Sequence, residues 1–196
     1  MGALPNALEM AMTAANSATR AGAHRLPRRR RAYVPVLAIV AAWVVMFLVA
    51  PHVRVGAEVQ RVALFIHLAA LVLGFGAVLT LDWSGLMWIL RRQDLGTLVR
   101  IAQAVHTPVW LGLAGLTLSG TLLRPDTSAP LTVVKLVAVL AVAVNGLGAA
   151  VVQRRLLALD GGTPPVPLML TAVLVAMVSQ LGWWTATVVG FLNAQG

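Results

Sequence analysis

Five long runs of apolar residues, separated by short stretches with prolines, glycines or charges, organise the chain. A helix needs about 20 apolar residues to cross the hydrocarbon core of a bilayer, which is close to the length of each run. The short connections favour antiparallel neighbours. The pattern therefore predicts an all-α, polytopic membrane protein, a five-helix up-down bundle. The predicted spans are Tyr33–Ala50, Val62–Leu90, Ile101–Leu123, Leu131–Val152 and Pro167–Leu192.

Composition supports the bilayer as solvent and partner. Hydrophobic residues make up 59% of the 196 residues and charged residues 11%, against about 25% charged in soluble domains. The chain has no cysteine, which excludes disulfides, thiol catalysis and iron–sulfur clusters. The net charge of +9 does not indicate nucleic-acid binding, because the arginines lie at the ends of apolar runs.

Arginine positions predict the orientation. The N-terminal arm and the second and fourth connections carry 11 arginines, whereas the alternate connections carry 3, Arg54, Arg61 and Arg124. Positive residues mark the cytoplasmic side, so we expect a cytoplasmic N-terminus and an external C-terminus. Residues 1–32 would form a basic cytoplasmic arm that is flexible or contains a short amphipathic helix over 7–19, and residues 33–196 would form the membrane domain. Abundant Ala, Val, Leu and Arg with a single Lys suggest a bacterial cytoplasmic (inner) membrane.

The first span also has the basic-then-apolar pattern of a signal peptide. Its charged region is very long, and Pro51 directly after Leu48-Val49-Ala50 suits a cleavage site poorly. We interpret it as an anchor, with a cleaved signal as the alternative. The second span is long enough either to tilt or to end in an interfacial turn around Asp82-Trp83-Ser84.

Five polar residues within the predicted spans form the candidate intramembrane site. They are His67, Asp82, His106, Lys135 and Asn145. Charged residues at the centre of a membrane helix cost about 2.5–3.5 kcal/mol on insertion scales, and they usually face the bundle interior.

Depth estimates at 1.5 Å per residue place these residues in two layers. His67 and Lys135 fall in the outer half, Asp82 and His106 in the inner half, and Asn145 just inside the middle. His67 and Asp82 share a helix face, because fifteen residues leave a rotation of about 60°. We therefore predict that both point into the bundle, that Asp82 approaches His106, and that His67 takes its partner from another helix, with Lys135 the nearest candidate.

Each residue also has a structural interpretation. Lys135 could extend to the outer surface, and Asp82 could cap an interfacial turn. His67 and His106 could make plain interhelical hydrogen bonds, and Asn145 could hold helices together. The tryptophans of the second and fifth spans fit interface belts or packing.

The stretches HLAALVLGFGAVLTLDWSGLMWILRR, WLGLAGLTLSG and KLVAVLAVAVNGLGAAVV resemble a group of uncharacterised bacterial multi-pass membrane proteins. That group is distantly similar to the four-helix membrane modules of copper-resistance D and cytochrome b561-type proteins. The resemblance covers residues 62–192 and implies that His67, Asp82, Lys135 and Asn145 carry the pattern. A b561-type module would imply heme b as cofactor, with His67 as the candidate ligand.

The chain departs from that module, because heme b between helices usually needs two axial ligands at similar depth. His67 and His106 lie in opposite halves, which leaves a His67–Met46 pair. Copper could use His67 with Met46 or His52, without a supporting spacing motif, so the metal is undetermined. No phosphate loop, HExxH helix or nucleophile elbow is present, which disfavours an enzyme.

These features predict a small membrane subunit or a proton- or ion-handling component, because His and Asp can exchange protons near neutral pH. The alternatives are a heme-binding electron-transfer module and a purely structural accessory subunit. Other membrane subunits or a second copy of the chain are the expected protein partners.

Overall fold

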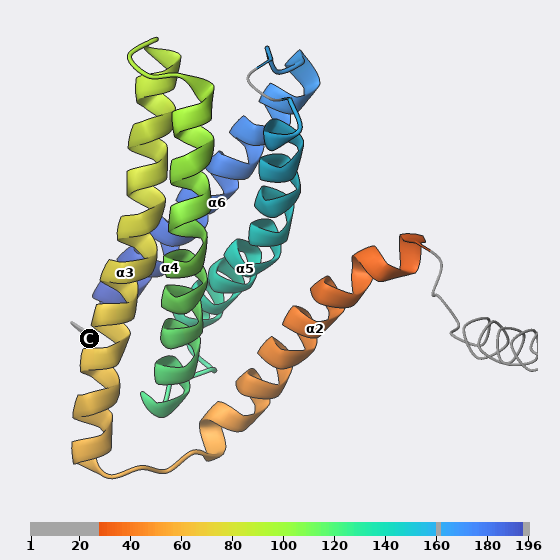
Figure 1. Ribbon diagram of the computed structural model, residues 1–196. Helices are drawn as coiled ribbons and strands as arrows, with labels where there is room; N and C mark the ends of the chain where they lie inside the picture. Colours follow the sequence, from red (N-terminus) through yellow and green to blue (C-terminus); the bar gives the residue numbers. More distant parts are fainter. Residues whose placement is uncertain (1–27, 160–161, 194–196) are drawn as a thin grey trace, which may run out of the picture. The chain divides into compact units, whose positions relative to one another are not determined.

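The computed structural model describes residues 28–159 and 162–193, which contain helices and no strand (Figure 1). The predicted all-α class and five spans are confirmed as five helices long and apolar enough to cross a membrane. The expected helix over 7–19 lies outside the described residues. The chain divides into two compact units, Met1–Pro35 and Val36–Gly196, and the second contains the packed helices. The elements are α2 (Arg28–Val49), a short 3₁₀ helix (Ala50–His52), α3 (Ala57–Ile89), α4 (Leu95–Leu122), α5 (Pro130–Leu157) and α6 (Val166–Asn193).

The helices extend beyond the apolar runs that predict them. Helix α3 begins at Ala57 rather than Val62, and α4 begins at Leu95 rather than Ile101. Helix α3 passes through Asp82–Ser84 without a turn, so the interfacial-turn alternative is wrong. Its 33 residues span about 50 Å, which is longer than a hydrocarbon core of about 30 Å.

The turn between α3 and α4 is held by hydrogen bonds at both helix ends. The N–H of Arg91 donates to Trp88 O at 2.9 Å and that of Arg92 to Met87 O at 2.8 Å. This is the Schellman pattern, with Arg91 at φ 56° where glycine is usual. Asp94 then caps α4 by accepting from the backbone N–H of Thr97 at 2.7 Å.

The hydrogen bond from the backbone N–H of Thr97, followed by one from the Thr97 hydroxyl, lowers the pKa of Asp94 below its usual range. A depressed carboxyl pKa stabilises the fold above the unfolded-state value of about 3.9. That contribution is lost as the pH falls through the lower folded-state pKa.

Helices α3 and α4 pack as an antiparallel pair in which their backbones touch. A Cβ added to Gly112 would overlap the Cα and N of Gly74, and one added to Gly115 would lie 2.8 Å from the Cβ of Ala70. Small residues allow this approach, which supports helix association where lipid supplies no hydrophobic driving force. The glycines also set the register, because 74 faces 112 and 70 faces 115.

Helices α5 and α6 form a second antiparallel pair beside the first (Figure 1). A Cβ on Gly182 of α6 would overlap Val142 of α5. Nearer the other end of the pair, the Asn145 Nδ2 donates to the Val175 carbonyl oxygen at 2.8 Å.

Aromatic side chains join the two pairs. Phe75 of α3 stacks on Trp183 of α6 with ring centroids 5.7 Å apart, and meets Trp184 edge-on at 5.1 Å. The Trp183 ring also packs over Gly74, where a Cβ would lie 2.8 Å from its Cη2 atom. Trp183 is 2% exposed, so its ring fills the space that the absence of a Gly74 side chain leaves.

Large apolar side chains cover the outer surfaces of the helices. Val72 is 74% exposed, and Leu118 and Leu181 are each 65% exposed. An apolar surface on this scale exceeds what soluble monomers display. It fits a chain whose outer surface contacts lipid.

The contact between Gly74 and Gly112 yields a stability prediction. We expect Gly112→Ala to lower the free energy of unfolding by about 1–3 kcal/mol, the usual cost of overpacking, because only backbone atoms stand in the way. Gly76→Ala in α3 is the matched control, since its Cβ would meet nothing within 4 Å. We expect it to be neutral or stabilising by up to about 1 kcal/mol. Thermal unfolding in detergent measures both, and equal behaviour would contradict the close-approach argument.

Candidate functional site

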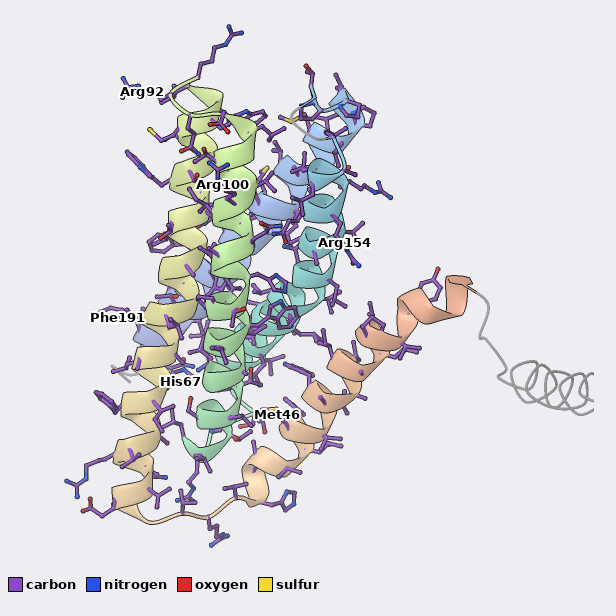
Figure 2. All side chains as sticks on the ribbon, viewed as in Figure 1. Met46, His67, Arg92, Arg100, Arg154 and Phe191 are labelled. Atoms are coloured by element: carbon purple, nitrogen blue, oxygen red, sulfur yellow. The ribbon has the colours of Figure 1, made fainter. Side chains whose placement is uncertain are left out.

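A cavity of about 630 Å³ lies in the half of Val36–Gly196 that contains the α2–α3 and α4–α5 connections. Sites for small molecules usually enclose about 300–1,000 Å³. The walls are mostly apolar, and they come from all five helices. The lining residues include Met46, His67, Thr117, Lys135, Trp183 and Thr187. Figure 2 labels His67 and Met46.

His67 is half-buried and bonded across the helix pair. Its Nδ1 lies 2.9 Å from the Ser119 Oγ of α4, and the Ser119 Oγ lies 2.5 Å from the Gly115 carbonyl oxygen. A serine hydroxyl has one hydrogen, and when that hydrogen goes to the Gly115 carbonyl, Ser119 accepts from the Nδ1–H of His67. In this tautomer the neutral His67 ring carries its proton on Nδ1 and leaves Nε2 as an acceptor.

The expected partnership of His67 is half right. Its partner does come from another helix, as predicted, but it is Ser119 and not Lys135. In the sequence Ser119 is one of several small residues on the third span that would permit close packing. Only the register set by the glycine contacts places its hydroxyl opposite His67.

Lys135 lines the same cavity as His67, so the predicted outer layer does bring these two together. The Lys135 side chain is half-buried. Within residues 28–159 and 162–193, no carboxylate oxygen lies within 4 Å of its ammonium group. It is also the only lysine of the chain. Among the described residues, the cavity thus contains a cation without a counter-ion.

Trp183 forms part of the cavity wall and has a buried indole N–H. Its ring lines the cavity, and its Nε1 is buried with no hydrogen-bond partner among the described residues. Buried N–H groups are nearly always paired, so this one is an exception that needs a reason. Its sequence position predicted packing or an interface belt. The packing is correct, but nothing in the sequence indicated that the ring would border a cavity.

Asp82 points into the bundle as predicted, where its carboxylate accepts a hydrogen bond from the Gln180 Nε2 of α6. This bond joins the two helix pairs on the far side of the Phe75–Trp183 stack from His67. The predicted approach to His106 is wrong as a direct contact. His106 is exposed, and its ring lies 6.3 Å from that of Trp110 on its own helix.

Asn145 behaves as the structural interpretation predicted, because its side-chain amide donates to the Val175 carbonyl oxygen of the neighbouring helix. Such bonds hold membrane helices together at roughly 0.6–2 kcal/mol each. Of the five candidate residues, the structure therefore brings only His67 and Lys135 to one cavity. Asp82 and Asn145 connect helices elsewhere, and His106 lies apart.

Two histidine ligands for heme do not fit this arrangement, because His106 does not line the cavity. Met46 and His67 both do, and His67 keeps Nε2 open, so a histidine–methionine pair is the ligand set compatible with these residues. His52 lies outside the cavity, with its Nδ1 3.0 Å from the Leu48 carbonyl oxygen. The described residues contain no group of three His, Cys, Asp or Glu side chains that could hold a metal ion.

Comparison of the chain with protein-family models, curated proteins and solved structures found no match. The resemblance to copper-resistance D and cytochrome b561-type modules stays a hypothesis that depends on the residues quoted above.

The bond between Asp82 and Gln180 can be tested by a double-mutant cycle. We expect Gln180→Leu to lower the free energy of unfolding by about 1–3 kcal/mol, because Asp82 is left without its donor. The same change in an Asp82→Leu background should cost much less, since no carboxylate remains to be satisfied. Equal costs in both backgrounds, measured by unfolding in detergent, would show that the two side chains are uncoupled.

Proposed function

We propose that this chain is a multi-pass protein of the bacterial cytoplasmic membrane, with five spans and a cytoplasmic N-terminus, that handles protons or ions at His67. It would act alone or as a small subunit of a larger membrane complex. The apolar outer surfaces of the helices support insertion. Arg92, Arg100 and Arg154 lie toward one end in Figure 2, which fits a cytoplasmic face at that end.

The observation that carries the proposal is the open Nε2 of His67. The contacts of Ser119 with His67 and with the Gly115 carbonyl favour the tautomer with the proton on Nδ1, in which Nε2 can take up a proton without breaking a hydrogen bond of the described residues. Histidine is the side chain whose ordinary pKa lies closest to neutral pH. A fixed ring with one free nitrogen beside a cavity is therefore suited to reversible proton binding.

Proton movement between the two polar sites would require a conformational change. His67 and Asp82 are separated on α3 by about 22 Å, and the intervening positions Ala70, Gly74, Phe75 and Val78 are buried. The stacked rings of Phe75 and Trp183 fill the space between the two helix pairs at this level. We infer that Trp183 would have to shift for a proton to cross, which makes it the barrier of the proposed pathway.

A second candidate function is electron transfer by heme b, because Met46 and His67 line one cavity. A Soret band in protein purified from native membranes, lost in both Met46→Leu and His67→Gln, would decide for it. The structural-subunit alternative interprets His67, Asp82 and Asn145 as interhelical bonds only. It predicts that replacing His67 by another hydrogen-bond donor has no functional effect.

We predict that the protein in liposomes speeds a proton flux driven by a potassium diffusion potential, and that His67→Gln returns the flux to the protein-free rate. Glutamine can still donate to Ser119 but cannot bind a proton near neutral pH. An internal pH-sensitive dye gives the rate.

His106→Gln is the matched control, because it makes the same chemical change at an exposed histidine outside the cavity, and we expect wild-type flux. Unfolding temperatures in detergent show whether the variants are folded. A wild-type rate for folded His67→Gln would remove the proton-handling proposal and favour the structural subunit.

For topology, we predict external reporters at the C-terminus and cytoplasmic reporters in the 91–94 connection, from the 11-to-3 distribution of arginines. Alkaline phosphatase fused at Gln195 should be active, and the same enzyme fused at Gln93 should be inactive. The reverse pattern would invert the orientation and move the His67 cavity to the cytoplasmic half.

A further inference from the structure

We propose that the cavity binds an amphiphile with an anionic head group, with Lys135 holding the head group and the apolar walls holding the hydrocarbon chain. This inference goes beyond the proposed function, because it does not require His67 to exchange a proton. It has its own test, and either idea can fail without the other.

Charge is the first reason. Lys135 is half-buried in the cavity wall, and none of the lining residues is acidic. Burial of a cation without a counter-ion is unfavourable, and snorkelling relieves that only in part for a side chain that is not exposed. An anion placed in the cavity would supply the missing counter-charge and accept up to three hydrogen bonds from the ammonium.

Hydrogen-bond accounting is the second reason. The hydroxyls of three lining threonines already donate to backbone carbonyls: Thr117 to Leu113, Thr121 to Leu118 and Thr187 to Trp183. His67 gives its Nδ1 proton to Ser119. Among the lining donors without a partner in the described part of the chain, the ammonium of Lys135 is the one that carries a charge. It calls for an acceptor, as a carboxylate or phosphate group provides, whereas the indole N–H of Trp183 is fully buried and does not face the cavity.

The walls are the third reason. Leu68, Leu113, Leu116 and Val139 line the cavity and offer methyl groups to a hydrocarbon chain. Each buried CH₂ is favourable by about 0.8 kcal/mol when it comes from water. A ligand that is a lipid itself brings that chain from an apolar phase, so selection would come from the head group at Lys135.

Two sources share this chemistry, a free fatty acid and an anionic phospholipid. The test titrates the purified protein in detergent with dibrominated stearic acid, whose bromines quench tryptophan fluorescence. Trp43 and Trp183 line the cavity and report occupancy. Parallel titrations use the methyl ester of the same acid, dibrominated phosphatidylglycerol and dibrominated phosphatidylcholine.

We expect the acid or phosphatidylglycerol to bind at least about tenfold more tightly than its uncharged or zwitterionic counterpart, the minimum worth of a hydrogen bond to a charged group. Lys135→Met should abolish that preference, and Lys135→Arg should retain it. Arg54→Gln is the matched control, because it removes an external cation that does not line the cavity, and it should keep the preference.

Equal binding of charged and uncharged probes to the wild-type protein would overturn the proposal, whatever the variants do. So would an anion preference that survives Lys135→Met or is lost equally in Arg54→Gln, since the charge of Lys135 would then not be its cause. If Lys135→Met does not fold, the wild-type comparison decides together with protection of this single lysine from acetylation. The acid should protect Lys135 from acetylation. Equal protection by the methyl ester would contradict the proposal.

Discussion

The contact between the backbones of Gly74 and Gly112 is the constraint on which the rest of the structure depends. Any side chain at Gly112 would overlap α3, so the two helices meet at one place and in one register. That register puts residue 67 opposite 119, which gives His67 its serine. The missing side chain at Gly74 also makes room for Trp183. One pair of glycines therefore positions the histidine, its partner and the aromatic side of the cavity.

The polar groups inside the bundle obey a second constraint, that each must find a partner where water is absent. His67 finds Ser119, Asp82 finds Gln180 and Asn145 finds the Val175 carbonyl oxygen. In each case the partner lies on another helix, so these polar side chains obtain their hydrogen bonds only when the helices pack together. Among the described residues, Lys135 and the Trp183 N–H depart from this rule. The Trp183 N–H is fully buried, whereas the Lys135 side chain lines the cavity. A charged donor in the wall of an apolar cavity favours the binding of an anionic group.

Much of the fold was predictable because length and hydropathy alone determine which segments can span a bilayer. The five helices follow from that. Their ends were less predictable. Helix α4 starts at Leu95, directly after the Asp94 cap and six residues before the apolar run, and Arg91 occupies a position where glycine is the usual signal. For polar residues on different helices, the sequence predicted only the depth of each side chain in the membrane. Depth brought His67 and Lys135 together correctly, but it also predicted Asp82 beside His106. Depth contains no information about rotation, and the rotation of α4 turns His106 outward. Gln180 is a polar residue within the fifth apolar run, yet no spacing rule pairs it with Asp82, 98 positions away.

The separation of the two polar sites bears on what the bundle can do as it stands. Between the His67 cavity and the Asp82–Gln180 bond, α3 is buried at Gly74, Phe75 and Val78, and Trp183 stacks flat on Phe75 with an interplanar angle of 5°. A continuous polar path is therefore not built into this arrangement. The cavity lies on one side of the stack, together with Lys135 and His67. A ligand that displaced Trp183 would change both the occupancy of the cavity and the barrier between the sites.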